Sequence, residues 1–174
     1  MNKILLAAGL LLVGFSACKK VDETKTADDS IRGTWARTGG KSWARNPFTG
    51  TVDTVADYTA NFPSCIKDDG LEFLASYKGI THLGSDQCNA GDPESVPFRW
   101  ETTGNGKNLH IYDVAEYFPH VRGNVNADIL TLTKGFMTLR YSIDTFFRLP
   151  QTPGGTDTVI VRDTVTFTDI FQKQ

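Results

Sequence analysis

The chain contains 174 residues, of which 40% are hydrophobic and 11% aromatic, and its formal net charge is −2. This length fits a single domain, and without a basic excess nucleic acid is not expected as a partner. The 11 Phe and 16 Gly residues are more typical of β-strands and turns than of helices.

The N-terminal segment has the layout of an export signal. Lys3 supplies a positive charge, and the apolar run at residues 4–13 is too short for a comfortable membrane span. Small residues then lead into Cys18, and this pattern resembles a bacterial lipobox, in which the cysteine is diacylated before the preceding segment is removed. The pattern departs at Phe15, where Leu is usual. We expect residues 1–17 to be a lipoprotein signal peptide and Cys18 to carry palmitate and other acyl chains that anchor the protein in the outer membrane.

Residues 18–30 follow as a polar segment. The stretch KKVDETKTADDS contains almost no apolar surface, which predicts a flexible tether between the lipid and the domain. Acidic residues soon after a lipidated cysteine are similar to a surface-export signal of such lipoproteins, but a merely soluble spacer explains them equally well. The leaflet, periplasmic or cell-surface, is therefore left open.

The cysteine count agrees with lipidation. Of three cysteines, Cys65 and Cys88 remain as a pair once Cys18 carries lipid, and an exported protein meets an oxidising compartment. Their disulfide would close a loop of about 24 residues and contribute about 3 kcal/mol on the chain-entropy model. Two unrelated buried thiols are the alternative. No Cys-x-x-Cys or His-x-x-x-His pattern occurs, so neither a metal nor another cofactor is expected.

From Ile31 onward the sequence shows no helical period. Short alternating segments with turn residues between them predict strands that open at Trp35 and lie around residues 51–58, 71–73 and 80–83, before a loop at 84–97.

A central hairpin can be placed in register. Asn105-Gly106 is the preferred pair for a turn with positive φ at both positions. Counting outward predicts two apolar pairs, Thr102 with Leu109 and Trp100 with Ile111, and two polar pairs, Glu101 with His110 and Arg99 with Tyr112. One face of this hairpin should therefore be buried and the other wet.

A second hairpin turns at Lys134-Gly135. The expected inward pairs are Leu132 with Met137 and Leu130 with Leu139, continuing to Tyr141 and Ile143. The last strand places Val159, Val161, Val165 and Phe167 in phase, and Asp163 falls on the same face, which a bulge or an inward charge would explain. About eight such strands predict an all-β domain at residues 31–174, an antiparallel up-and-down barrel.

Three motifs carry a family resemblance. Gly33-Thr34-Trp35 resembles the Gly-x-Trp signature of lipocalins, and CIKDDGLEF from Cys65 and WETTGNGKNLHI from Trp100 resemble segments of bacterial lipocalin-like lipoprotein domains. The resemblance covers roughly residues 31–145. It implies a lipocalin-like barrel in which Trp35 closes one end, with an arginine from a late strand stacked on it; the candidates are Arg140, Arg148 and Arg162.

Catalysis is not expected. His110 lies opposite a glutamate on the wet face, His82 follows a turn, His120 lies in a loop, and no nucleophile motif accompanies them. Asp68 and Asp69 have two explanations, a contribution to a calcium site or ordinary turn chemistry before a strand.

Two functions remain. The protein is either a lipid-anchored binding protein that holds a small apolar or amphipathic ligand in its barrel, or a surface interaction protein, an inhibitor or assembly accessory, with a filled barrel. The inward side chains that would line a cavity, or fill the barrel, are Phe98, Trp100, Ile111, Met137 and Tyr141. In the second case recognition would fall to the loops at 61–69, 84–97 and 150–156.

Overall fold

The computed structural model describes residues 26–46, 49–114, 117–118, 123–150 and 158–174. The expected signal peptide, Cys18 and most of the tether lie outside these residues, as do His120 and nearly all of the expected loop at 150–156. Within the described part of the chain, no helix is long and apolar enough to cross a membrane.

The described strands form one antiparallel sheet that closes on itself. The barrel order is β1 (Gly33–Arg45), β3 (Gly70–Phe73), β4 (Lys78–His82), β5 (Ser95–Thr103), β6 (Asn108–Val114), β7 (Gly123–Leu132), β8 (Phe136–Pro150) and β9 (Thr158–Lys173), and β9 pairs back with β1. Spatial neighbours follow chain order and every pairing is antiparallel, so the predicted eight-strand meander barrel is confirmed. One additional strand, β2 (Val52–Val55), pairs with the end of β1.

The expected strand at residues 51–58 is shorter than predicted. The chain leaves β2 after Val55 and forms the 3₁₀ helix η1 (Tyr58–Asn61), followed by the short helix α2 (Ser64–Lys67). Asp57 caps η1 by accepting a hydrogen bond from the Thr59 amide at 3.1 Å, which ends the extended conformation. A further 3₁₀ turn, η2 (Ala75–Tyr77), separates β3 from β4.

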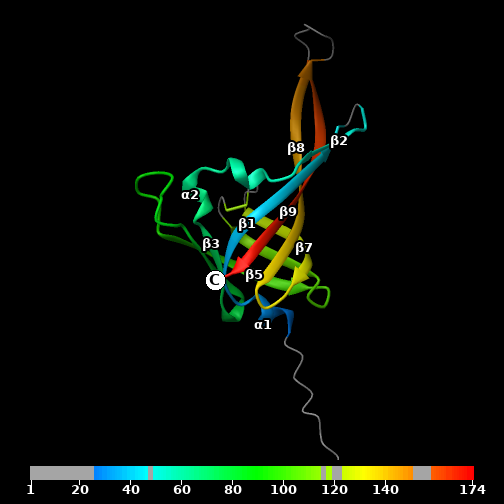
Figure 1. Ribbon diagram of the computed structural model, residues 1–174. Coiled ribbons are helices and arrows are strands. Elements are labelled where there is room, and N and C mark those ends of the chain that lie inside the picture. The colour runs from blue at the N-terminus through cyan, green and yellow to red at the C-terminus, as the bar shows by residue number, and fades with distance from the viewer. Residues whose placement is uncertain (1–25, 47–48, 115–116, 119–122, 151–157) are drawn as a thin grey trace, which may run out of the picture.

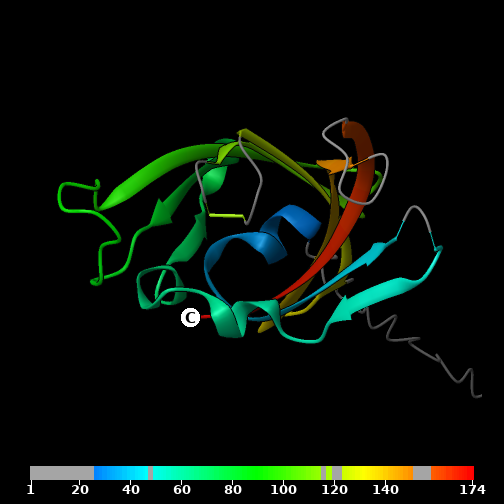
Figure 2. The same cartoon turned by 90° about the horizontal axis from the view of Figure 1, so that it is seen from above.

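The two ends of the barrel differ. One end carries η2, the turn between β5 and β6, the C-terminus and the helix α1 (Ala27–Ile31), whereas α2 and the loop between β4 and β5 lie at the other. Seen along the barrel, α1 lies inside the ring of strands and covers the first end (Figure 2). Its first turn is capped by Thr26 and contains Asp28 and Asp29, which suit a helix N-terminus.

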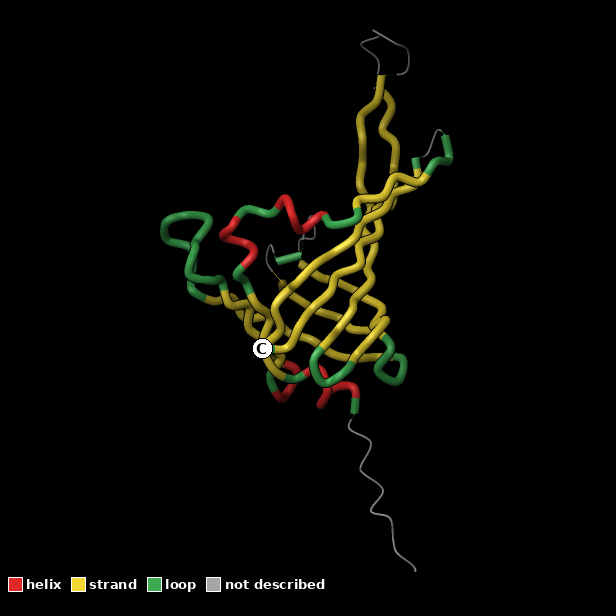
Figure 3. The backbone as a smooth tube through the Cα atoms, in the orientation of Figure 1, coloured by secondary structure: helices red, strands yellow, loops and turns green. Residues whose placement is uncertain are grey.

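The sheet extends beyond the barrel at the end opposite α1. The paired parts of β8 and β9 and the far end of β1 with β2 project from it (Figures 1 and 3).

Alternating inward side chains fill the middle of the barrel. Among the described residues the largest fully buried ones are Trp35, Trp100, Phe73, Phe118 and Phe171, joined by Leu109, Ile111, Met137 and Leu139. This set contains Trp100, Leu109 and Ile111 of the first predicted hairpin and Met137 and Leu139 of the second.

The first hairpin has the predicted register. Thr102 pairs with Leu109, Trp100 with Ile111, Glu101 with His110 and Arg99 with Tyr112. Asn105 and Gly106 have positive φ as predicted, and Gly104 does too. The turn is longer than two residues because the Thr103 carbonyl accepts hydrogen bonds from the amides of both Gly106 and Lys107, each at 3.1 Å.

The predicted register of the second hairpin is correct only next to its turn. Leu132 pairs with Met137, but a bulge lies between Ile129 and Thr131, so Ile129 rather than Leu130 faces Leu139. Leu130 is consequently 47% exposed. The Ile129 amide is drawn to the Lys107 carbonyl, which accepts its hydrogen bond at 2.7 Å from the neighbouring hairpin.

Candidate binding cleft at the open end of the barrel

The five side chains expected to line a ligand cavity belong to the packed interior. Phe98, Trp100, Ile111, Met137 and Tyr141 are all buried. Aromatic contacts account for part of this packing, since the rings of Phe98 and Trp100 each lie 5.4 Å from that of Phe73. Trp100 also donates its indole N–H to the Lys78 carbonyl at 2.8 Å. None of the five lines the two clefts described below.

Trp35 lies at the end of the barrel covered by α1. Its indole N–H donates to the Ile31 carbonyl at 2.5 Å, which fixes the ring under the last turn of the helix. The cation over this ring is Lys173, whose Nζ is 5.1 Å from the ring centroid. Of the three candidate arginines, Arg140 instead forms an exposed ion pair with Asp128 at 2.7 Å, and the side chains of Arg148 and Arg162 lie outside those described.

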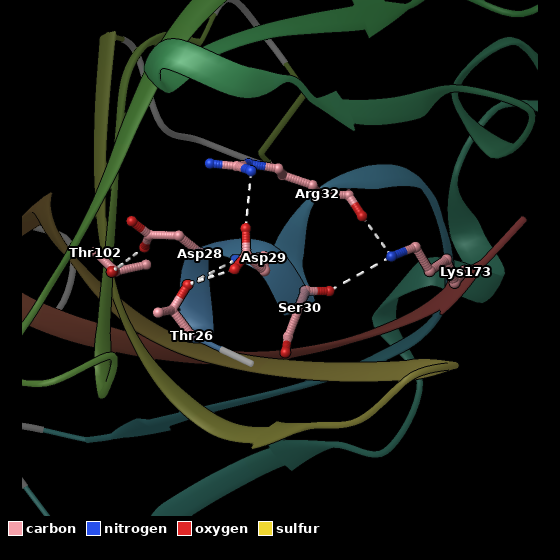
Figure 4. A network of polar contacts seen from close by, with 7 residues as sticks. All are labelled: Thr26, Asp28, Asp29, Ser30, Arg32, Thr102 and Lys173. Carbon is pink, nitrogen blue, oxygen red and sulfur yellow. Dashed lines mark hydrogen bonds and ion pairs between the residues drawn. The ribbon is translucent and has the colours of Figure 1, made fainter. Parts of the chain in front are cut away.

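Polar contacts hold α1 in this position (Figure 4). Lys173 donates to the carbonyls of Ser30 and Arg32, and the Thr102 hydroxyl of β5 donates to Asp28. These bonds connect the helix to two different strands of the barrel. The α1 end is therefore closed by both packing and hydrogen bonds.

Cys65 and Cys88 form a disulfide, as predicted, with their Cα atoms 5.2 Å apart. The bond joins α2 to the loop between β4 and β5, two segments that the meander does not otherwise pair. A second link nearby is the hydrogen bond from Ser64 to Asp86 at 2.5 Å. The expected recognition loops at 61–69 and 84–97 are thus held together.

A cleft of about 280 Å³ lies beside this disulfide. Strand direction places it at the open end, because its walls come from α2, the start of β3, the end of β4 and the start of β5. Its lining combines apolar side chains with a few polar ones: Cys65, Ile66, Leu83, Cys88, Pro93, Val96, Tyr117, Asp69, Gln87, Asn89 and Asp92.

Asp69 is the buried carboxylate of this cleft, with 6% of its surface exposed. It accepts the Gly84 amide hydrogen at 3.0 Å, and burial raises its pKa. Its neighbour Asp68 is exposed and accepts a hydrogen bond from the Asp86 amide at 3.3 Å. Both carboxylates therefore bind backbone of the β4–β5 loop, and no group of three or more potential metal ligands occurs among the described side chains.

Tyr117 is a buried residue of the cleft wall. Its hydroxyl is buried without a hydrogen-bond partner among the described residues, and burial raises its pKa to about 12. The nearby Asp69 carboxylate contributes to that shift, so the two groups lie within electrostatic reach. An orphaned buried hydroxyl loses its hydrogen bonds to water and gains none in return.

Arg37 occupies the barrel interior behind Tyr117. Its side chain is 6% exposed, with Nε 3.1 Å from an Asp169 carboxylate oxygen, and it donates to the Tyr117 carbonyl at 3.0 Å. The guanidinium lies 4.6 Å from the centre of the Tyr117 ring. Asp169 also accepts hydrogen bonds from the hydroxyls of Tyr58 and Tyr141.

The buried ion pair between Arg37 and Asp169 was not predicted from the sequence, although the alternation of both strands places these two residues on the inward face. Asp169 is in phase with Val165, Phe167 and Phe171, as Arg37 is with Trp35. Asp163, which the alternation also places on the inward face, is half-buried and opposes Thr145 in an unbroken register, so no bulge lies there.

Arg37 also borders a second, adjacent cleft of about 220 Å³. That cleft shares Ile66 with the first and has Phe62 and Lys67 among its other walls. Lys67 is engaged with the Ala60 carbonyl at 3.0 Å.

The described histidines lie on the outer surface. His82 contacts Glu72 at 2.8 Å and borders a surface cleft that Ser85 and Ser95 also line, whereas His110 contacts Thr103 at 3.1 Å. A scan against protein-family models found no match to the chain, and neither did a search of curated proteins.

Proposed function

We propose that this is a lipid-anchored, lipocalin-like β-barrel protein that binds a small amphipathic molecule at the open end of its barrel. The observation that carries the proposal is the cleft beside the Cys65–Cys88 disulfide. Small-molecule sites are typically concave and mostly apolar, with a few polar groups that orient the ligand. Ile66, Leu83 and Val96 supply the apolar walls, and Asp69 and Tyr117 supply the polar groups.

The direction of the chain supports the same proposal. The described chain begins at Thr26, next to α1, whereas the cleft lies at the opposite end of the barrel. An anchor at Cys18 would therefore join the domain through its closed end. The cleft would face away from the bilayer, where it is open to dissolved molecules.

The cleft is tested by filling it. Val96→Trp puts a large ring into the cleft, and Val52→Trp is the matched control because Val52 is exposed on β2. The native lipoprotein and both variants would be purified in parallel, and the small molecules that accompany them identified by mass spectrometry. We expect wild type and Val52→Trp to carry the same molecule and Val96→Trp to lack it. Identical contents in all three, or none in any, would contradict the proposal.

The anchor has a separate test. Cys18→Ala should abolish incorporation of labelled palmitate and release the protein from membranes, because the acyl chains supply most of the membrane affinity. Cys65→Ala leaves Cys18 intact and is the control, which should still be labelled. A wild-type protein that stays in membranes without label would refute the anchor.

A second candidate function is protein recognition by the surface. On one face of the β1–β2 extension Trp43 is 42% exposed and Val52 is 52% exposed, and the register places both on the same side of the sheet. Exposed apolar side chains that lie together are typical of interaction sites. Cross-linking of wild type and Trp43→Ser in cells tests it: a partner captured only by wild type, with the cleft carrying no small molecule, would favour this function.

A further inference from the structure

The cleft beside the disulfide has a one-sided polar lining. Its charged side chains are the carboxylates of Asp69 and Asp92, and its other polar groups are the amides of Gln87 and Asn89 and the hydroxyl of Tyr117. No lysine, arginine or histidine lies among the described residues that line it. The only charge that the described lining would present to a ligand is therefore negative, beside amide and hydroxyl groups that can both donate and accept hydrogen bonds.

The two carboxylates of the cleft differ in how many hydrogen bonds they already accept from the protein. Asp92 accepts hydrogen bonds from the backbone N–H of Asn89, at 2.9 Å, and from the side-chain amide of the same residue. Its carboxylate is therefore used within its own loop. One Asp69 oxygen accepts the Gly84 amide hydrogen. A carboxylate has acceptor capacity for several donors, so Asp69 retains capacity for a ligand.

The hydroxyl of Tyr117 is a second, independent observation that indicates a ligand in the cleft. The Tyr117 side chain lines this cleft, and its hydroxyl is buried and unpartnered among the described residues. A phenol oxygen accepts as well as donates. A ligand that donates several hydrogen bonds would satisfy Tyr117 and Asp69 together.

The nearby positive charge does not oppose a cation in the cleft. Arg37 lies on the face of the Tyr117 ring, and Asp169 neutralises it at 3.1 Å inside the barrel. The Asp69 carboxylate forms no ion pair with a described residue and is attracted by Arg37 only from farther away, so burial in a poorly solvated wall makes its negative charge costly.

Resting on the proposed binding function, we infer that the cleft selects a cationic amphiphile, a small apolar body that carries a protonated primary amine. The ammonium group has three donors on one atom, enough to bind the Asp69 carboxylate and the Tyr117 hydroxyl and to leave one for Gln87 or a water molecule. The apolar body lies against Ile66, Leu83 and Val96.

Three probes of equal chain length separate the contributions. Hexylamine, 1-hexanol and hexanoate would be titrated calorimetrically into the purified full-length protein at neutral pH, with blank titrations into the same buffer and detergent. Hexylamine is protonated there, as a lysine side chain is. We expect it to bind at least about tenfold more tightly than 1-hexanol, the value of one hydrogen bond to a charged group, and hexanoate not to bind measurably.

Matched variants locate the effect. Asp69→Asn keeps an acceptor for the Gly84 amide and should weaken hexylamine by about tenfold while leaving 1-hexanol unchanged. Asp68→Asn removes the same charge one residue away, outside the cleft lining, and should change neither affinity appreciably. Tyr117→Phe should weaken hexylamine by about threefold to tenfold, and because it deletes an unpartnered hydroxyl it should not lower the melting temperature.

The outcomes distinguish the inference from the proposed function. If none of the three probes binds, the binding function itself fails. If 1-hexanol or hexanoate binds as well as hexylamine, the cleft binds small molecules but its selectivity for cations is refuted. Equal losses in Asp69→Asn and Asp68→Asn would also refute the inference, since a general surface potential would then explain the preference.

Discussion

At the scale of single residues, the barrel interior contains a charged pair where an apolar core would suffice. Arg37 and Asp169 are both largely removed from water, and their attraction must offset the cost of desolvating two charges. The surrounding groups reduce that cost, because Tyr58 and Tyr141 donate to the carboxylate and the Tyr117 carbonyl accepts from the guanidinium. The opposing charge raises the pKa of Arg37 despite its burial, which keeps the guanidinium charged.

Removing one partner of this pair should be costly. Asp169→Asn leaves Arg37 buried without a counter-charge, so we expect the free energy of unfolding to fall by about 3 to 5 kcal/mol. Asp128→Asn is the control, because Asp128 pairs with Arg140 at the exposed surface and should contribute no more than about 1 kcal/mol. Urea unfolding of both variants measures the difference. Equal small losses would mean that the interior pair does not depend on its charge.

The buried tyrosines predict how stability varies at high pH. Burial raises the pKa of Tyr117 to about 12 and also raises those of Tyr58 and Tyr141. In the unfolded chain these phenols ionise from about pH 10, so the unfolded state loses protons first and is favoured as the pH rises. Their stabilising effect is complete below about pH 10 and lost as the pH passes through the folded values, about 2 to 3 kcal/mol for Tyr117 alone. Tyrosinate absorbance should therefore rise together with the loss of circular dichroism; ionisation of all five tyrosines in a still-folded protein would refute this.

The buried polar residues of the barrel show which features could be predicted from the sequence and which could not. Asp169 could have been found from strand parity, because it alternates with Phe167 and Phe171. Its partner could not, since Arg37 and Asp169 are 132 positions apart and meet only once β9 pairs with β1. The orphaned hydroxyl of Tyr117 likewise depends on packing that no local pattern encodes.

At the scale of elements, registers set by a local turn were predictable and those set by neighbours were not. The Asn105-Gly106 turn and the alternation of Trp100 and Ile111 agree with each other, and the structure has the same pairs. The predicted pairing of Leu130 with Leu139 was wrong because the strand bulges where the Ile129 amide donates a hydrogen bond to the adjacent hairpin. A contact between two hairpins is invisible in either of them alone.

The disulfide acts at this scale because it joins two loop segments that form the cleft. No free thiol should be found at Cys65 or Cys88 without prior reduction, as intact-mass analysis after alkylation would show. Replacing both cysteines by Ala should lower the free energy of unfolding by about 3 kcal/mol on the chain-entropy model. It should also weaken ligand binding, because Cys65 and Cys88 both line the cleft. A thiol that reacts before reduction, or binding that is unaffected, would contradict this role.

At the scale of the whole molecule, the closed end of the barrel is separate from the end that contains the proposed binding cleft. The closed end contains α1 and Trp35 and lies where the described chain begins, whereas the open end contains the disulfide, the clefts and the projecting strands. The fold class followed from serial hairpins without room for crossover helices. The position of the cleft did not follow, because it is built from irregular segments whose arrangement no strand pattern determines.

This separation predicts that core and cleft respond differently to mutation. Trp100 was expected to line a ligand cavity, but it is buried against Phe73 and outside the cleft lining. Trp100→Ala should therefore leave a hole in the core and lower the free energy of unfolding by about 3 to 5 kcal/mol. The affinity for hexylamine should change by less than about twofold, since no group that contacts the ligand is removed.

The matched comparison is Val96→Trp, which fills the cleft and should abolish hexylamine binding while costing less stability than Trp100→Ala. Val96 is only half-buried, so a larger side chain there displaces ligand or water rather than core. Melting temperature and calorimetric affinity, measured on both variants, together show whether the ligand lies in the cleft or inside the barrel. If Trp100→Ala instead weakened binding about tenfold or more with an unchanged melting temperature, the ligand would lie inside the barrel, as the inward face of the hairpins first suggested, and the cleft would be only its entrance.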